Sequence, residues 1–443
     1  MLTLRRLLEQ IVPTHLLKNI LSAYHFGLSG LGALLYRFPS RKIIVIGVTG
    51  TKGKSSTTEL LNSIFEEAGH KTALLNSIRI KIGEMSEPNL LRMTMPGRFF
   101  IQRFLSEAEK GKCTVAILEM TSQGASQHRH RFIDMNGLIF TNIAPEHIES
   151  HGSYEKYADA KFEIARELVR SEKRPRIVVA NADSKESARY LALPIEQKLP
   201  FSLSLCSPWS ADETGRPSTG ESADFVARPA ATTGGHFHFD GIDIAINLPG
   251  EFSLKNALAA ATLARALGVK TETTKSALAK IRRIPGRAEE IKEGQDFIVV
   301  VDYAHTPDSL EALYGAYGSL RKICVLGATG GGRDTWKRSV MGGIADKSCG
   351  HVILTNEDPY DENPRTIVDE VASGMKRKPE IIMDRREAIR SAFTSARAGD
   401  AILITGKGTD PCICVEKGER IPWSDALVAR EELRSLLGKK KDV

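Results

Sequence analysis

The stretch that decides the fold of this chain is Gly47-Val48-Thr49-Gly50-Thr51-Lys52-Gly53-Lys54-Ser55-Ser56-Thr57. The apolar, β-branched run 42–46 precedes it, and residues 58–65 follow it with apolar side chains at helical spacing. A buried strand, a glycine-rich turn and a helix N-terminus form a cradle whose backbone N–H groups and helix dipole point at an anion. The stretch therefore predicts a phosphate-binding loop at the end of a parallel strand.

Two side chains of this loop carry the chemistry of phosphate binding. Lys54 is placed to reach the β- and γ-phosphates of a nucleotide, and the Ser55 hydroxyl is placed to face Mg²⁺. The strict P-loop pattern has glycine where this chain has Val48, so the loop is a variant of that pattern. An ordinary glycine-rich turn is the alternative, and the Gly-Lys-Ser run between a strand and a helix argues against it.

Length and composition limit the class of protein. A chain of 443 residues with 42% hydrophobic and 26% charged residues has room for two or three globular domains. The net charge of +7 suits an anionic ligand, but it is dispersed and aromatic content is only 6%, which argues against nucleic acid. Six scattered cysteines without a Cys-x-x-Cys pair predict neither a zinc ribbon nor a disulfide framework. With no signal peptide evident, we expect a cytoplasmic location.

Residues 1–40 form an apolar segment interrupted by Gly27, Gly30 and Gly32, with Lys18 near its start and Arg37 after it. The segment is short for a membrane-spanning helix. We expect a helix that packs on the following domain. The alternative is a helix that contacts a membrane interface.

The rest of the chain alternates strands and helices, the pattern of an α/β fold. In 41–284, a P-loop-type doubly wound central domain, we expect strands at 115–119, 137–142 and 177–181, a loop at 207–220, a hairpin at 236–248 and a helix at 253–267. In 285–443, a Rossmann-like C-terminal domain, we expect strands at 297–301, 322–326, 351–354 and 401–404. Ligands of such folds collect at the carboxyl ends of the strands.

Several polar residues lie at those strand ends. Glu119 could hold Mg²⁺ directly or through water, or it could be a solvated acid. His147 and Lys161 taken alone would more often be a structural histidine and a surface lysine. The polar segment 302–308 opens a helix, and the glycine loop 327–334 brings Arg333 to a position that suits carboxylate recognition.

Together these segments resemble the Mur ligases, the ATP-dependent amide ligases of peptidoglycan precursor synthesis. Within the family the chain is most similar to the MurE branch, which adds the third residue of the stem peptide. The resemblance runs from about residue 42 to 436. The motifs that carry it are Gly50–Ser56, Glu119–Ser122, Thr141-Asn142 with His147, His151–Tyr154, Ala160-Lys161, Gly250–Ser253 with Asn256, Gly286–Glu289, Asp302–Asp308, Gly406–Gly408 and Trp423–Asp425.

The resemblance implies a role for each matched position. The ATP contacts would be Gly50, Thr51, Lys52, Gly53, Lys54, Ser55, Ser56, Asn256, Arg287 and Asp302. The Mg²⁺ ligands would be Ser55, Glu119, His147 and Lys161, the last as a carbamate, and Lys54, Lys161 and His147 would be the catalytic residues. The substrate contacts would be Thr94, Thr121, Gln127, Arg129, Arg333, Glu357, Asp358, Pro359, Tyr360, Gly406 and Asp410.

The reaction that the resemblance implies has two steps. A carboxylate of the muramoyl-peptide acceptor attacks the γ-phosphate of ATP, which gives an acyl phosphate and ADP. The amine of a free amino acid then attacks the acyl carbon, and phosphate leaves as the amide forms. Preorganised positive charge, from Mg²⁺ and Lys54, would stabilise the transferring phosphoryl group.

Two segments depart from the family pattern. Only residues 1–40 precede the first strand, where the family has a domain that binds the uridine nucleotide, so a lipid-linked or otherwise modified acceptor is a hypothesis here. The family's Asp-Asn-Pro-Arg is Glu357-Asp358-Pro359-Tyr360, and its Gly-Lys-Gly-His-Glu is Gly406-Lys407-Gly408-Thr409-Asp410. Because Tyr360 replaces the arginine that clamps the distal carboxylate, we predict that meso-diaminopimelate is not the preferred amine.

Three other functions fit parts of the pattern. A folylpolyglutamate-synthetase-like ligase shares the phosphate loop, but the segments 302–308 and 357–359 argue against it. An amidating subunit that acts on lipid-linked muropeptides typically carries a cysteine-rich zinc insert, which this sequence lacks. A non-catalytic P-loop ATP-binding protein would not need Glu119, His147 and Lys161 together.

Overall fold

The computed structural model describes residues 14–146, 148–203 and 234–438, which form two compact units. Unit 1 contains the described residues up to Ile143, with Glu155–Ser202 and Ala259–Lys270. Unit 2 contains Ala144–Tyr154, the described part of 203–258, and the chain from Thr271 onward. The loop expected at 207–220 lies outside the described residues, and the domain bounds drawn from the sequence stay predictions.

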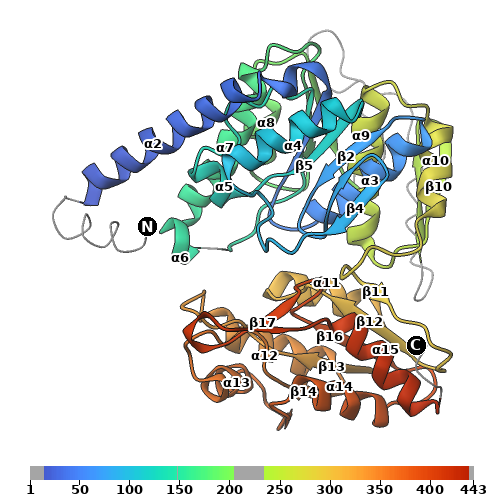
Figure 1. Cartoon of the computed structure of the whole chain (residues 1–443). Helices are drawn as coiled ribbons and strands as arrows, with labels where there is room; N and C mark the ends of the chain where they lie inside the picture. Colours follow the sequence, from blue (N-terminus) through green and yellow to red (C-terminus); the bar gives the residue numbers. More distant parts are fainter. Residues whose placement is uncertain (1–13, 147, 204–233, 439–443) are drawn as a thin grey trace. The chain divides into compact units, whose positions relative to one another are not determined.

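Unit 1 is built on an eight-stranded mixed sheet with helices on its faces (Figure 1). In spatial order its strands are β4 (Met85–Pro88), β3 (Arg79–Ile82), β2 (Thr72–Leu75), β5 (Val115–Glu119), β1 (Ile44–Thr49), β6 (Gly137–Phe140), β7 (Ile177–Asn181) and β8 (Gln197–Phe201). The six strands from β2 to β8 run parallel, and β3 and β4 add an antiparallel edge.

β1 lies inside this sheet because its residues are apolar on both sides of the strand. It pairs in parallel with β5 and with β6, so the loop that follows β1 opens at the carboxyl edge of three strands. One face of the sheet packs on helices α4 (Arg98–Lys110) and α7 (Tyr154–Arg170) through buried aliphatic side chains. Helix α3 (Lys54–Glu67) packs against β1, β2 and β5.

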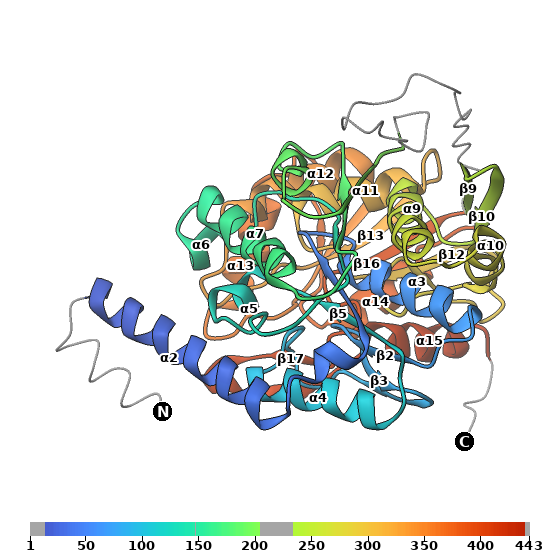
Figure 2. The ribbon, with the colours of Figure 1, turned by 90° about the horizontal axis from the view of Figure 1, so that it is seen from above.

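The N-terminal segment forms helix α2 (Thr14–Leu35), which packs along α4 (Figures 1 and 2). This confirms the expected helix packed on the following domain. The opposite side of α2 carries exposed apolar side chains, namely Ile20, Tyr24, Leu31, Leu34 and Leu35. No helix within the described residues has the length and apolar character needed to cross a membrane. Contact of α2 with a membrane interface stays a prediction.

Five more α-helices and one hairpin lie among the described residues before residue 281. They are α5 (Ser122–Ser126), α6 (Ile148–His151), α8 (Ser187–Leu191), α9 (Glu251–Ala266), α10 (Thr271–Lys280) and the antiparallel pair β9 (Gly235–Phe239) and β10 (Ile242–Ile246). The hairpin predicted at 236–248 and the helix predicted at 253–267 are therefore confirmed.

Unit 2 is built on a six-stranded mixed sheet, in the order β11 (Glu289–Glu290), β12 (Ile298–Asp302), β16 (Ala401–Thr405), β13 (Lys322–Leu326), β14 (His351–Leu354) and β15 (Glu380–Ile381). Alternate strand residues face two cores. One core is closed by α11 (Pro307–Ala316), α12 (Lys337–Ser348) and α13 (Pro364–Ala372), and the other by α14 (Arg385–Thr394) and α15 (Asp425–Leu436). A small ribbon pairs β17 (Cys412–Cys414) with β18 (Arg420–Pro422).

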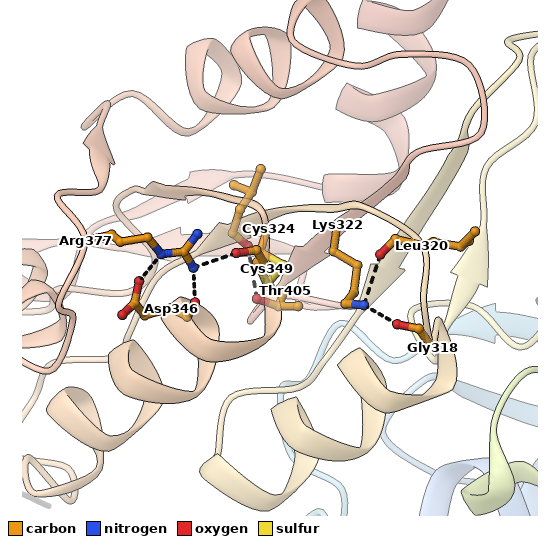
Figure 3. The surroundings of a disulfide bond; sticks show 9 residues. Gly318, Leu320, Lys322, Cys324, Asp346, Cys349, Arg377 and Thr405 are labelled. Atoms are coloured by element: carbon orange, nitrogen blue, oxygen red, sulfur yellow. Dashed lines mark hydrogen bonds and ion pairs between the residues drawn. A yellow bond between two sulfur atoms is a disulfide. The ribbon is translucent and has the colours of Figure 1, made fainter.

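A disulfide bond joins Cys324 of β13 to Cys349, which follows α12 (Figure 3). The cysteine pattern predicted no disulfide framework, and that prediction was wrong for this pair because the fold places the end of α12 and β13 in one hydrophobic core, although the two cysteines are 25 residues apart. Arg377 donates hydrogen bonds to the Cys349 carbonyl at 2.8 Å and to the Asp346 carboxylate at 2.8 Å, which ties the end of α12 to the segment after α13.

Candidate active site

The phosphate loop of unit 1 depends on glycine at two positions. Gly50 has a φ of 147°, and a Cβ there would lie 1.9 Å from the Thr141 hydroxyl oxygen. Gly53 has a φ of 81° and is the N-cap of α3. The chain can therefore pass close to β6 and enter the helix only because both residues lack side chains.

The loop is held to the segment after β6 by hydrogen bonds. The Lys52 N–H donates to the Asn142 side-chain oxygen at 2.9 Å, and the Thr141 hydroxyl donates to the Lys52 carbonyl at 2.6 Å. Lys54 is the first residue of α3 and donates to the Thr51 carbonyl at 2.9 Å. These contacts fix the loop before any ligand binds, as a preorganised anion site requires.

Ser55 and Glu119 meet at Ser77, which follows β2. The Ser55 and Ser77 hydroxyl oxygens lie 2.8 Å apart, and the Ser77 N–H donates to the Glu119 carboxylate at 2.9 Å. Glu119 is the last residue of β5 and is buried. Hydroxyl and carboxylate oxygens are the ligand types that Mg²⁺ prefers, so the donor set fits this cation.

Lys161 is buried beneath the phosphate loop, which corrects its interpretation as a surface lysine. Its Nζ donates to the Gly50 carbonyl at 2.6 Å and lies 4.7 Å from the centre of the Tyr157 ring. The Tyr157 hydroxyl in turn lies 2.8 Å from the Thr51 hydroxyl. Helix α7 thus supplies two side chains that support the loop from below.

The rest of the predicted metal site is only partly described. His147 lies outside the described residues. Within residues 14–146, 148–203 and 234–438, no group of three or more His, Cys, Asp or Glu side chains is arranged to hold a metal ion. The described candidate ligands are therefore Ser55, Glu119 and Lys161.

The residues predicted to bind the acceptor lie around α5. Thr121 is the N-cap of α5, and its side chain accepts from the Gly124 N–H at 3.1 Å. Arg129 donates to the Gln127 side-chain oxygen at 2.6 Å and also to the Met95 carbonyl. Thr94 precedes Met95, so all four predicted residues lie in one region of unit 1.

In unit 2, Asp302 ends β12 and fixes two neighbouring segments. Its carboxylate accepts from the backbone N–H of Ala288 and of Ala304, each at 2.6 Å. Burial raises the pKa of Asp302, and the charge of Arg287 partly offsets this. Arg287 lies over the Tyr303 ring, 4.8 Å from its centre. The predicted nucleotide contacts Arg287 and Asp302 are therefore neighbours, and Asn256 is buried on α9.

The segment that departs from the family pattern forms a buried cluster in unit 2. The Asp358 carboxylate accepts from the Lys407 ammonium at 2.8 Å and from the Cys414 N–H at 2.7 Å. Although burial lowers the pKa of Lys407, the charges of Asp410 and Asp358 outweigh it and raise that pKa. One acid of this segment is therefore already neutralised by a lysine.

Glu357 is the second acid of that segment, and it is less satisfied. Its Oε1 accepts from the Thr329 hydroxyl at 2.7 Å, whereas its buried Oε2 has no hydrogen-bond partner among the described residues. A Cβ at Gly406 would lie 2.5 Å from that oxygen. Tyr360 has a φ of 51° and packs against Gly331 of the glycine loop. One oxygen of the Glu357 carboxylate therefore lacks a donor among the described residues.

Sequence reasoning missed four residues that build these sites, namely Ser77, Tyr157, Thr329 and Lys407. Ser77 and Tyr157 belong to no motif of their own, and Thr329 lies in the glycine loop 327–334 without an assigned role there. Only contacts in the fold reveal what these three residues do. Lys407 lies inside the quoted Gly406-Lys407-Gly408 motif. A lysine between two glycines close to paired acids was a signal that could have indicated a buried counter-charge.

Two protein-family models match the chain. The model of the Mur ligase middle domain matches residues 48–264, and that of the Mur ligase glutamate ligase domain matches residues 286–408. The first contains the phosphate loop, Glu119 and Lys161, and the second contains Asp302 and the Glu357–Asp358 segment. The two matches together span most of the chain.

Individual relatives agree with these matches. The UDP-N-acetylmuramoyl-L-alanyl-D-glutamate–2,6-diaminopimelate ligase of Syntrophomonas wolfei is 35% identical over 411 residues, which cover 91% of this chain and 81% of the relative. The UDP-N-acetylmuramyl-tripeptide synthetase of a Roseiflexus species is 35% identical over 430 residues, covering 92% and 82%.

Solved structures share the fold. A UDP-N-acetylmuramoyl-L-alanyl-D-glutamate–2,6-diaminopimelate ligase superposes with a TM-score of 0.59 at 25% identity, over 89% of this chain and 79% of that one. The folylpolyglutamate synthase of Mycobacterium tuberculosis superposes at 0.61 with 15% identity, over 94% and 95%, which shows a common fold alone. With both family models matched and the phosphate loop in place, this chain belongs to the Mur ligases, as a MurE-like, ATP-dependent peptide ligase of peptidoglycan precursor synthesis.

Proposed function

We propose that the chain joins a free amino acid to a carboxylate of a muramoyl-dipeptide acceptor, and that the reaction takes place in the cytoplasm. The observation that carries this proposal is the phosphate loop, in which Gly50, Lys54 and Ser55 are fixed beside Glu119. The names of the relatives, a diaminopimelate ligase and a tripeptide synthetase, support the acceptor class.

The metal that assists the reaction is Mg²⁺, held by Ser55 and Glu119. When bound, the cation would neutralise charge on the ATP phosphates. His147 and Lys161, the latter as a carbamate, complete the proposed ligand set. The position of buried Lys161 beside the phosphate loop supports this role, because a carbamate would turn its cationic end into an anionic oxygen ligand of the kind that Mg²⁺ prefers.

Different residues of the chain act in the two chemical steps. Lys54 stabilises negative charge as the acceptor carboxylate attacks the γ-phosphorus and the bond to ADP breaks. Arg129 and Thr121 orient the acceptor peptide. After the amine attacks the acyl carbon, phosphate leaves and the nitrogen loses a proton. Asn256, Arg287 and Asp302 contact the nucleotide.

The amine that we propose is not meso-diaminopimelate. Tyr360 stands where a clamp for a distal carboxylate would need an arginine, and the neighbouring acids Glu357 and Asp358 favour a positively charged group. Because Lys407 already pairs with Asp358, the unsatisfied Oε2 of Glu357 is the acceptor for the incoming ammonium. Arg333, Gly406 and Asp410 line the same site.

The test is phosphate release from ATP and Mg²⁺ with UDP-muramoyl-dipeptide, across a panel of amino acids that includes lysine, ornithine and meso-diaminopimelate. Release that requires both substrates, with the ligated product identified by mass, is the expected result. Glu357→Gln should raise the KM for the amino acid, whereas Glu370→Gln, an acid of α13 that pairs with Arg338, should leave it unchanged. Efficient turnover with meso-diaminopimelate would overturn the amine proposal alone.

A further inference from the structure

Four basic side chains gather in unit 1 where α2 meets the first turn of α4. His25 comes from α2, Arg98 is the first residue of α4, and His128 and Arg129 follow α5. We call these four residues the α2–α4 cationic cluster. Helices α2 and α4 lie side by side in both views (Figures 1 and 2). Only Arg129 was among the predicted site residues.

The two guanidinium groups of the cluster are held by neutral partners. Arg98 donates to the His25 ring nitrogen Nδ1 at 2.8 Å and to the Gln127 carbonyl at 3.1 Å. Arg129 donates to the Gln127 side-chain oxygen at 2.6 Å and to the Met95 carbonyl. The contacts set the direction of both side chains but supply no negative charge.

Other arginines of the same region are compensated. Arg131 pairs with Glu163 at 3.0 Å and with Glu167 at 2.9 Å. Within the described residues, neither Arg98 nor Arg129 forms an ion pair with any carboxylate. The positive charge of the cluster is therefore a local excess and not a general property of this surface.

The cluster is also incompletely hydrogen-bonded. The Nε atoms of Arg98 and Arg129 and the Nδ1 of His128 are buried without a hydrogen-bond partner among the described residues. Burial and then the charge of Arg98 lower the pKa of Arg129, and the same two causes lead the lowering for His25. Buried donors and mutually repelling charges cost free energy that a bound anion would recover.

The backbone adds to the positive potential. Gly97 is the N-cap of α4 and provides no capping side chain, and a Cβ placed on it would meet no atom within 4 Å. The N-terminal end of a helix of 13 residues carries a partial positive charge. Arg98 and Arg129 are each half-buried, so both side chains are partly accessible to solvent.

The cluster adjoins the acceptor site and not the phosphate loop. The Met95 carbonyl accepts a hydrogen bond from Arg129, and the Met95 sulfur accepts one from the Thr121 N–H at 3.1 Å. Met95 therefore contacts both the cluster and a residue predicted to bind the acceptor peptide. The ATP phosphates have their own cradle in Gly50–Ser56.

We propose that Arg98, supported by His25 and His128, forms with Arg129 a subsite for an oxyanion of the muramoyl acceptor, either a phosphate of its diphosphate or a peptide carboxylate. The inference rests on the proposed function for the identity of the acceptor. Guanidinium pairs are the side chains best suited to such groups because they offer parallel N–H donors. Helix α2 is then a part of the acceptor site, because it supplies His25.

A binding experiment tests the site without requiring catalysis. Pyrophosphate is titrated by calorimetry into the full chain while the phosphate loop is filled with a non-hydrolysable ATP analogue and Mg²⁺. We expect Arg98→Gln to weaken pyrophosphate binding at least tenfold. The matched control is Arg103→Gln on the same helix, where the native arginine pairs with Glu107 on the surface, and it should change affinity less than twofold. Equal affinities in the three proteins, both for pyrophosphate and for the acceptor fragments described next, overturn the proposal, whatever the ligase assay shows.

Acceptor fragments identify the source of the oxyanion. Binding of UDP-muramoyl-dipeptide, of UDP-muramic acid without the dipeptide, and of muramoyl-dipeptide without the diphosphate is compared in wild type and Arg98→Gln. A loss confined to the two diphosphate compounds supports a phosphate ligand, and a loss confined to the two dipeptide compounds supports a carboxylate. A loss of the same size with all three, accompanied by a lower melting temperature, shows a structural role and overturns the proposal.

Steady-state kinetics separate positioning from folding. Arg98→Gln is expected to raise the KM for the acceptor at least tenfold while the KM for ATP changes less than twofold. Arg98→Lys restores the charge but not the paired donors, so it should recover part of the loss. Equal values for the glutamine and lysine variants would contradict a charge-recognising role.

Discussion

Gly50 lies where the phosphate loop passes close to Thr141. A Cβ at Gly50 would lie 1.9 Å from the Thr141 hydroxyl oxygen, so adding a single methyl group there should destabilise the fold. We expect Gly50→Ala to lower the free energy of unfolding by more than about 2 kcal/mol and to abolish tight ATP binding, because the Cβ overlaps the Thr141 hydroxyl. Urea unfolding and the KM for ATP measure the two effects.

The control isolates the steric cause. Gly69 also has a positive φ, of 84°, but a Cβ there meets no atom within 4 Å. Gly69→Ala should therefore cost only the backbone strain, about 1 kcal/mol. Equal losses in the two variants would show that backbone conformation, and not the approach to Thr141, decides the outcome.

His130 makes the stability of unit 1 sensitive to acid. It is 1% exposed, neither ring nitrogen has a hydrogen-bond partner among the described residues, and burial followed by the charge of Arg131 lowers its pKa to about 3. The unfolded chain takes up a proton near pH 6.5, whereas the folded chain does not, so stability falls as pH drops below 6.5. The loss reaches about 2 kcal/mol at pH 5.

Replacing the imidazole should remove this dependence. We expect His130→Leu to show a smaller decrease in unfolding free energy between pH 8 and pH 5 than the wild type. Chemical denaturation at both pH values gives the comparison. Parallel pH curves for the two proteins would assign the acid sensitivity to another group.

At the residue scale, what could be predicted from the sequence depended on motifs. The glycines, Lys54 and Ser55 stand in a pattern that fixes both their conformation and their partners. Lys161 also stands in a matched motif, but its burial could not be predicted, because helical spacing alone does not tell which face of α7 lies against the phosphate loop. The free Oε2 of Glu357 is likewise visible only once the chain has folded.

Among the elements of unit 2, the disulfide links β13 to the segment before β14. Its loop spans 25 residues, so closing it restricts the unfolded chain and stabilises the folded one by about 3 kcal/mol. We expect Cys349→Ser to be less stable than the wild type by this amount in oxidising buffer. Adding a reductant should bring the wild type down to the variant, as measured by denaturant unfolding. A wild-type protein that shows two free thiols by mass would contradict the bond.

The elements differ in how well their positions could be predicted. β13 and β14 begin and end where the sequence predicts, because each is a continuous apolar run bounded by polar residues. β1 starts and ends later than the predicted run 42–46, because pairing of Val48 with Glu119 carries the strand to the loop. β4 was not predicted because all four residues of Met85–Pro88 are exposed, and they form a strand only by pairing with β3 at the edge of the sheet.

For the whole molecule, binding of nucleotide should increase the free energy of unfolding. A ligand at one hundred times its Kd adds about 2.7 kcal/mol to the free energy of unfolding. We expect ATP with Mg²⁺ to raise the melting temperature, and EDTA to remove most of the gain if Ser55 and Glu119 hold the metal. Thermal denaturation with and without each component is the measurement.

A variant of Glu119 tests whether this residue is the metal ligand responsible for the gain in melting temperature. Glu119→Gln should lose the metal-dependent part of the gain, because an amide oxygen is a weaker ligand for a hard cation than a carboxylate oxygen. Glu107→Gln, on the exposed side of α4, should keep the gain in full. A full gain in Glu119→Gln would remove this residue from the metal site.

The pairing of β1 also has a consequence for biosynthesis. Its first partner, β5, begins 71 positions further along the chain, since Ile44 pairs with Val115, and its second partner β6 comes later still. At about 5–20 residues per second, the ribosome needs about 4–14 s to deliver that partner. During that interval a strand that is buried in the folded sheet has neither neighbour, so the yield of folded protein should depend on how fast the chain is translated and on chaperones that cover a nascent strand.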